Sequence, residues 1–300
     1  MLLSKHTVRE KDASGEFDKL KFFQERFFIM LKRTITSIVG IAVLIPVILF
    51  SNTVVLPIAV AVFSVIALLE MFKCIGIYEN VLLTFPFYIL SVISPFAMRY
   101  LWLDPMKQSV AFLLILIIIM LYEFTIMVFS KGKLDLSKTT TAFFVSVYII
   151  FAFCGIIYLR DAGNDYVYLL VFIMAWLTDI FAYLTGMLLG KHKLIPEISP
   201  KKTVEGSIGG VVVSTAVFVI VSKFLPALEL SNINIFVLII SGIIMSFVAQ
   251  IGDLCMSAVK RQFGIKDFGK LFPGHGGVLD RFDSVLAVSA VMTVLFIIIM

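Results

Sequence analysis

The chain has 300 residues, of which 60% are hydrophobic and only 15% carry a charge. A soluble domain is typically about 45–50% apolar and about 25% charged, so this composition excludes an ordinary cytosolic enzyme, a disordered chain and a coiled coil. The mean hydropathy of +1.06 leaves too little polar surface to cover a water-soluble fold. The sequence therefore predicts an all-α, polytopic integral membrane protein. The net charge of +5 is typical of membrane topology and contact with anionic lipid, so no nucleic-acid partner is expected.

Apolar runs long enough to cross a bilayer, about 20 residues each, follow a polar N-terminal stretch. Residues 1–34 are basic and contain four phenylalanines between 22 and 28, which predicts a cytoplasmic amphipathic segment on the membrane surface. Residues 35–165 hold about five predicted transmembrane helices, and residues 166–300 hold four more with two polar loops. The nine predicted spans are 35–51, 54–73, 81–101, 108–130, 139–159, 166–189, 207–226, 232–259 and 283–300.

The distribution of basic residues orients these spans. With nine spans, 21 of the 25 Lys and Arg residues fall on the side that holds the N-terminus and the two polar loops. Lys and Arg are retained on the cytoplasmic side during insertion. We therefore expect a cytoplasmic N-terminus and a functional site that faces the cytoplasm.

The second polar loop, residues 250–284, is dense in residues that bind metal or phosphate. Asp253, Ser257 and Lys260 share one helical stripe at the end of a span, and Asp280 and Asp283 share one face at the start of the next. Three carboxylates at one membrane-interface position would suit Mg²⁺, which takes oxygen ligands together with substrate phosphates. Asp253, Asp280 and Asp283 are therefore the predicted metal ligands and catalytic residues.

Cations and glycines surround these acids. Gly276 and Gly277 let the backbone approach a ligand closely, and their N–H groups are suited to cradling an anion. His275 lies between them and Gly274, where it would make either a nucleotide contact or a local structural bond. The predicted phosphate-neutralising cations are Lys260, Arg261, Lys266 and Arg281. Together these groups indicate phosphoryl or nucleotidyl transfer.

The first polar loop, residues 175–210, adds hydroxyls and lysines. Its candidates for binding a phosphate-rich ligand are Ser199, Lys201, Lys202 and Thr203, followed by Glu205. Asp179 lies within the preceding span, where a charged group is kept only with a partner or in a watery cavity. We treat Asp179 as a candidate site residue, with a hydrogen-bonded interfacial acid as the alternative.

The run from Ser257 to Asp283 resembles the signature of the phosphatidate cytidylyltransferase family, also called CDP-diacylglycerol synthases. The first loop, with its Ser-Pro-Lys-Lys-Thr-x-Glu-Gly run, is also similar to the family. The shared signature positions are Ser257, Lys260, Arg261, Lys266, Asp267, Gly269, Pro273, His275, Gly276, Gly277, Asp280, Arg281 and Asp283.

The resemblance implies a reaction and a set of roles. Members of the family join CTP and phosphatidic acid to give CDP-diacylglycerol and pyrophosphate, in phospholipid biosynthesis, with Mg²⁺ required. The implied two-metal centre is held by Asp253 and Asp280 with Asp283 beside them, and its second metal is divalent or monovalent, such as K⁺. Lys260 and Lys266 would act as catalytic cations, and Lys201 and Lys202 would close over the site. The apolar helices also allow a homodimer.

Two other functions fit parts of the sequence. A CTP-dependent kinase of a polyprenol-type lipid would use similar groups but would release CDP instead of pyrophosphate. A transporter would fit the composition, yet the polar residues gather on one side and no repeat is visible. The spacing typical of CDP-alcohol phosphotransferases is missing from the chain.

Overall fold

The computed structural model describes residues 42–299 and alternate residues from 34 to 40, except 102–104, 133, 164–165, 229 and 275. The side chains of 105–109 are likewise outside the description. The helices are α2 (Val55–Cys74), α3 (Val81–Tyr100), α4 (Pro105–Phe129), α5 (Leu136–Ala162), α6 (Leu169–Leu189), α7 (Val204–Phe224), the short η1 (Pro226–Leu228), α8 (Ile235–Gln262) and α9 (Leu279–Ile299).

The predicted helical membrane architecture is confirmed. In the described part of the chain, eight helices are long and apolar enough to cross a membrane. They match the second to ninth predicted spans, with ends that differ by at most four residues. The first predicted span lies where only some residues are described, and those from 36 to 49 are helical. The predicted amphipathic segment lies outside the described residues, apart from the helical Thr34.

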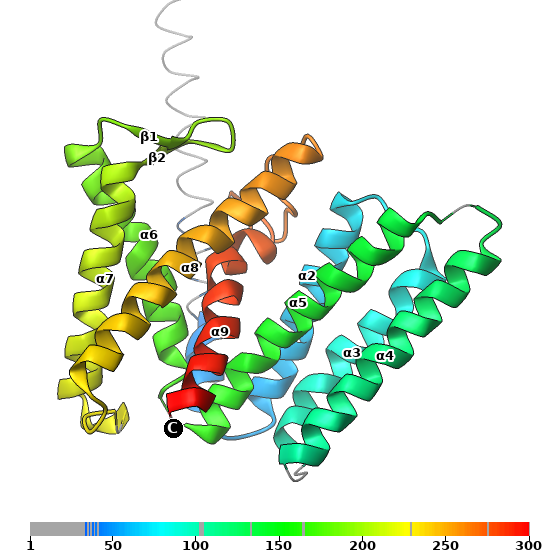
Figure 1. Ribbon diagram of the computed structural model, residues 1–300, viewed down its shortest axis with the longest axis horizontal. Helices are drawn as coiled ribbons and strands as arrows, with labels where there is room; N and C mark the ends of the chain where they lie inside the picture. The colour runs from blue at the N-terminus through cyan, green and yellow to red at the C-terminus, as the bar shows by residue number, and fades with distance from the viewer. Residues whose placement is uncertain are drawn as a thin grey trace, which may run out of the picture.

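Helix α9 occupies the centre of the molecule. Figure 1 shows it between α6, α7 and α8 on one side and α2 to α5 on the other. Helix α9 packs against α8, α5 and α6 and also touches α2, while α6 and α7 form the most extensive helix pair. The two predicted regions of the chain therefore share one core, and the central helix belongs to the region that carries the motifs.

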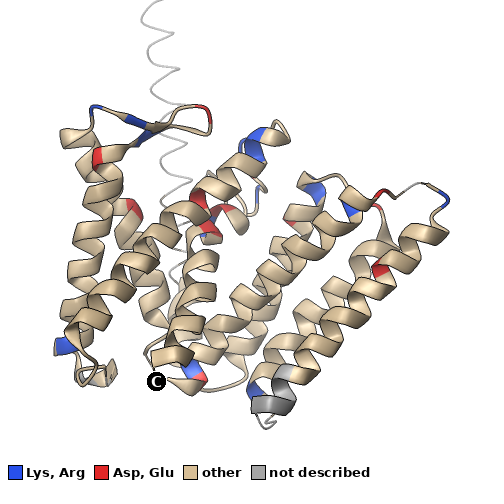
Figure 2. Ribbon diagram, viewed as in Figure 1, with Lys and Arg blue, Asp and Glu red and all other residues tan. Residues whose placement is uncertain are grey.

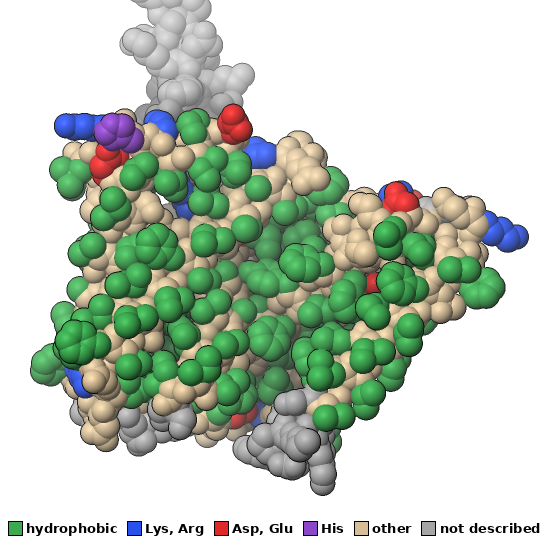
Figure 3. All heavy atoms as spheres, in the orientation of Figure 1, with side chains coloured by type: hydrophobic (Ala, Val, Ile, Leu, Met, Phe, Trp, Pro, Cys, Tyr) green, Lys and Arg blue, Asp and Glu red, His purple; other side chains and the backbone are tan. Residues whose placement is uncertain are grey.

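The outer surface is that of a membrane protein. Hydrophobic side chains cover the middle of the face in Figure 3, and many large ones are more than half exposed, such as Phe144, Val212 and Phe236. Figure 2 shows Lys and Arg mainly at the two ends of the helices. An apolar band between two charged ends is the pattern that a bilayer requires.

Local hydrogen bonds explain where two helices begin. Asp135 precedes α5 and its Oδ1 accepts from the Lys138 N–H at 2.7 Å, so α5 starts before the apolar run. Thr203 precedes α7 and its Oγ1 accepts from the Gly206 N–H at 3.1 Å. Such caps satisfy N–H groups that have no partner within the helix.

A feature that the sequence did not predict is a small antiparallel sheet between α6 and α7. Strands β1 (Lys193–Ile195) and β2 (Ser199–Thr203) form a hairpin, with Lys193 opposite Thr203. Figure 1 shows the hairpin above the ends of α6 and α7, on the same side as the loop between α8 and α9. The hairpin gives the first polar loop a fixed shape.

Candidate active site

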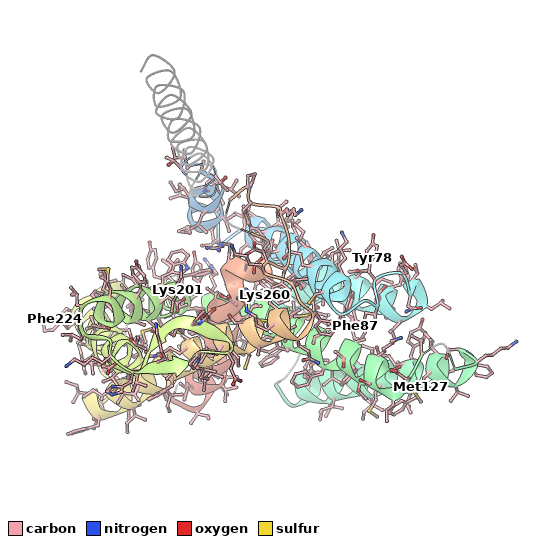
Figure 4. The ribbon with its side chains drawn as sticks, turned by 90° about the horizontal axis from the view of Figure 1, so that it is seen from above. Tyr78, Phe87, Met127, Lys201, Phe224 and Lys260 are labelled. Carbon is pink, nitrogen blue, oxygen red and sulfur yellow. The ribbon has the colours of Figure 1, made fainter. Side chains whose placement is uncertain are left out.

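The structure brings the two polar loops together through an ion pair. Lys202 on β2 places its Nζ against Asp253 Oδ2 on α8, and both side chains are less than a quarter exposed. In the view from above in Figure 4, Lys201 of the hairpin and Lys260 of α8 both appear between Phe224 and Met127. Residues about 50 positions apart in the sequence thus form one site at the end of the membrane helices.

Three carboxylates from three helices form an acidic group next to this ion pair. The acidic group consists of Asp179 on α6, Asp253 on α8 and Asp283 on α9, whose charges act on one another. Ser284 donates a hydrogen bond from its Oγ to Asp179 Oδ2 at 3.1 Å. Lys202 also acts on Asp179, and Lys260 acts on Asp283, so two lysines offset part of the negative charge. Asp179, predicted only as a candidate, lies within the site.

A glycine allows α8 and α9 to meet beside the acidic group. A Cβ at Gly252 would lie 2.6 Å from Ala287 Cβ and 2.9 Å from the carbonyl oxygen of Asp283. Any larger residue would push the two helices apart, because real Cβ atoms do not come this close. Gly252 therefore sets the separation of Asp253 from Asp283.

Asp280 belongs to a different and more enclosed cluster. Its Oδ1 pairs with Lys260 Nζ at 2.8 Å, and its Oδ2 accepts from the N–H groups of Phe268 at 2.8 Å and Gly277 at 2.9 Å. The Asp280 side chain is only 3% exposed. Buried charges persist when they are paired and hydrogen-bonded, and Asp280 satisfies both conditions from within the protein. We call Lys260 and Asp280 the buried pair.

The sequence expectation of three carboxylates at one position therefore needs correction. Asp280 turns back toward the loop, whereas Asp253 and Asp283 join Asp179. Within the described residues, no three His, Cys, Asp or Glu side chains are grouped closely enough to hold a metal ion by themselves. Mg²⁺ is usually bound by one or two carboxylates together with substrate phosphates, so the oxygen donors of Asp253 and Asp283 fit its chemistry.

The glycine-rich turn, residues 269–277, does not offer the amides that were expected to cradle an anion. The Gly276 N–H donates to the Phe272 carbonyl at 3.1 Å, and the Gly277 N–H donates to Asp280. Gly276 has a φ of +92°, a conformation that suits glycine. His275 lies outside the described residues. The turn shapes the site through bonds within the protein.

Glu70 on α2 is a residue of this region that was not among the predicted site residues. It is 7% exposed, and its Oε1 and Oε2 accept from the N–H groups of Val278 at 3.0 Å and Leu279 at 2.9 Å. An acid near the end of an apolar run was the only signal in the sequence. Its partners lie more than 200 positions away, so spacing could not identify them.

Several predicted cations are exposed on the two polar loops and at the ends of α8 and α9 that adjoin the second loop. Lys201 on the hairpin, Lys266 in the loop and Arg281 on the first turn of α9 are all exposed. Arg261 is exposed too, and one of its guanidinium N–H groups donates to the Ile265 carbonyl at 3.3 Å. Exposed cations beside carboxylates can attract a polyphosphate, whereas Lys202 and Lys260 already have carboxylate partners.

Other predicted residues have structural partners. Thr203 caps α7, and Glu205 holds the base of the hairpin by accepting from His192 Nδ1 at 2.6 Å and from the Lys191 N–H at 3.1 Å. Ser199 and Ser257 are half-buried, and Asp267 is exposed. Their roles in binding phosphate stay predictions.

An apolar cavity of about 180 Å³ lies on the membrane side of the acidic group. Its walls come from α2, α5 and α6 and from residues 44–48, and Phe282 of α9 contributes to it. The Phe282 ring packs 5.3 Å from Phe63 and 5.4 Å from Phe153, measured between ring centroids. Because Phe282 directly precedes Asp283, the cavity adjoins the site.

Comparison with known proteins identifies the family. Residues 31–299 match the model of the cytidylyltransferase family. A protein of Staphylococcus haemolyticus named phosphatidate cytidylyltransferase is 34% identical over 276 residues, which cover 89% of this chain and 99% of the relative. A protein of the same name from Staphylococcus aureus is 34% identical over 273 residues, with the same coverage. One from Staphylococcus saprophyticus is 41% identical over 170 residues, covering 57% of this chain and 64% of the relative. The chain therefore belongs to the cytidylyltransferase family, and it is a membrane-embedded nucleotidyltransferase.

Proposed function

We propose that this chain transfers the cytidylyl group of CTP to phosphatidic acid, forming CDP-diacylglycerol and pyrophosphate in phospholipid biosynthesis. The observation that carries the proposal is the alignment, almost from end to end, with proteins named phosphatidate cytidylyltransferase. The site supports it, because carboxylates and exposed cations meet at the end of the membrane helices. A water-soluble nucleotide and a membrane lipid can both reach such a position.

The reaction requires positioning more than proton transfer. A phosphate oxygen of phosphatidic acid would attack the α-phosphorus of CTP, and the bond from that phosphorus to the bridging oxygen would break to release pyrophosphate. The attacking phosphate monoester is largely ionised near neutral pH, so no general base is needed. Lys201, Lys266 and Arg281 would hold the triphosphate and stabilise the charge on the leaving pyrophosphate.

Mg²⁺ fits the acidic group. Asp253 and Asp283 would hold the ion, with Asp179 beside them, and Lys202 would leave Asp253 for the substrate phosphates. A bound Mg²⁺ would neutralise negative charge on the phosphates in the transition state. The three negative charges of the acidic group also suit a second cation, for which K⁺ is our candidate.

The lipid would approach from the side. We propose that the site faces the cytoplasm, which the excess of 21 of 25 basic residues on that side supports. The apolar cavity beside Phe282 is suited to part of a hydrocarbon chain, since empty cavities of this kind are dry and bind apolar molecules. The exposed cations would then meet the lipid phosphate at the interface.

A product assay tests this function. Detergent-purified protein would receive CTP, phosphatidic acid and Mg²⁺, and pyrophosphate and CDP would be measured separately, with Asp283→Asn as the inactive control. Pyrophosphate that depends on both the lipid and the wild-type protein is the expected result. Release of CDP with a polyprenol would favour a lipid kinase, and folded wild-type protein that gives neither product would overturn the proposal.

A further inference from the structure

Glu70 joins α2 to the start of α9, where the motif residues begin. Its two carboxylate oxygens each accept one hydrogen bond, from the N–H groups of Val278 and Leu279. The first N–H groups of a helix have no partner within the helix, and a carboxylate at this end also interacts favourably with the helix dipole. Glu70 therefore satisfies donors that would otherwise be buried and unpaired.

Two glycines of the turn leave room for this carboxylate. A Cβ at Gly269 or at Gly277 would lie 2.2 Å from Glu70 Oε1. Neither residue has a positive φ, so space and not backbone conformation accounts for glycine at both positions. The position of Glu70 thus explains glycine at 277, which was predicted to let a ligand approach, and at the signature position 269.

The turn is held from two sides. Glu70 accepts hydrogen bonds from the N–H groups of Val278 and Leu279. Asp280 accepts hydrogen bonds from the N–H groups of Phe268 and Gly277. Arg281 lies in the first turn of α9, and Asp283 follows directly after that turn. A small rotation of this turn would move both of those side chains relative to Asp253 and Asp179 on the neighbouring helices.

We propose that Glu70 is a positioning residue of the cytidylyl-transfer site. It orients the first turn of α9, and through it Arg281 and Asp283, without touching the substrate. This inference rests on the proposed function for its kinetic readout. Helix α2 belongs to the part of the chain that carries no motif. Through Glu70 it would nevertheless contribute to turnover.

The matched pair Glu70→Gln and Glu123→Gln tests this role. Glu123 on α4 is also a buried glutamate, at 2% exposure, but its Oε1 has no hydrogen-bond partner in the described part of the chain. Glu70→Gln loses one amide acceptor, so kcat should fall about tenfold to a hundredfold, the effect of one hydrogen bond to a charged group. KM for CTP should change less than threefold, and Glu123→Gln should keep wild-type kinetics. An unchanged kcat in Glu70→Gln would overturn the proposal.

Hydrogen exchange supplies a readout that does not depend on activity. The peptide containing the 278 and 279 amides should exchange faster in Glu70→Gln than in the wild type, and at the wild-type rate in Glu123→Gln. If wild-type protein forms no pyrophosphate, the proposed function fails, while faster exchange would still support the positioning contact. Equal exchange in all three proteins would overturn the contact.

A double variant tests whether glycine is required because of Glu70. Gly269→Ala should lose activity because its Cβ would collide with the Glu70 carboxylate. In a Glu70→Ala background that collision is removed, so Gly269→Ala should cause no more than a twofold further loss. Residues in contact are expected to be non-additive in this way. Independent, multiplying losses would overturn the assignment.

Discussion

The buried pair of Lys260 and Asp280 leads to a prediction that separates structural from catalytic aspartates. Asp280→Asn keeps the shape of the side chain but leaves the Lys260 ammonium buried without a counter-charge. Breaking a buried pair from one side costs about 3–5 kcal/mol of stability. We therefore expect Asp280→Asn to lower the unfolding temperature of the detergent-purified protein clearly, together with its activity.

Asp283→Asn is the matched control for this change. Asp283 Oδ1 accepts one hydrogen bond, from the Ser284 N–H at 2.8 Å, and the charges of Asp179 and Asp253 repel it. Removal of its charge relieves this repulsion, so the unfolding temperature should stay equal or rise, while turnover should fall by more than about a hundredfold because a metal ligand is lost.

The unfolding temperature is measured by thermal unfolding with a thiol-reactive dye or intrinsic fluorescence. Turnover is measured as pyrophosphate release on the same samples. The double variant Lys260→Met with Asp280→Asn removes both charges. Its loss of unfolding free energy should therefore be smaller, by about 0.5–3 kcal/mol, than the sum of the losses in the two single variants. If Asp280→Asn unfolds at the wild-type temperature and is inactive, Asp280 acts directly in the chemistry, and the division into two clusters is wrong.

Three further predictions concern the helix crossing, the metal and the cavity. Gly252→Val should reduce turnover at least about tenfold, because its side chain would force α9 away from α8; pyrophosphate release at the wild-type rate would contradict this. Chelation of Mg²⁺ with EDTA should abolish pyrophosphate release, and added Mg²⁺ should restore it, whereas activity that persists in EDTA would exclude the proposed ion. Ala59→Phe would fill part of the apolar cavity, so kcat/KM should fall more for long-chain than for short-chain phosphatidic acid; an unchanged ratio would show that the cavity does not receive the lipid.

The membrane helices could be predicted because their physical requirement is local. A spanning helix needs about 20 apolar residues whatever it packs against, and the eight spans found in the described residues follow those runs closely. The ends were less accurate where a side chain extends the helix. Helix α5 begins at Leu136 because Asp135 caps it, and α9 begins at Leu279 because Glu70 accepts its first amides.

The sequence could indicate which loops carry the candidate site, but it could not indicate how their acids are paired. The motif spacing predicted that Asp280 and Asp283 share one face at the start of α9, whereas the structure places Asp280 with Lys260 and the loop amides and Asp283 with Asp253 and Asp179. Which carboxylate faces the acidic group and which faces the loop depends on where Lys260 and the Phe268 amide lie. Those positions follow from the packing of α8 and from the path of the loop, neither of which is encoded in spacing along one helix.

The start of α9, residues 279–284, connects most of the molecule to the chemistry. It is bonded to α2 through Glu70, to α8 through the buried pair and to α6 through Ser284 and Asp179. A shift in any one of these helices would therefore reach Asp283, because side chains in a close-packed interior transmit displacement and do not absorb it. The spans that lack motifs thus support the site mechanically, and substitutions at the end of α2 should impair turnover more than equally buried substitutions in α4, which lies away from α9.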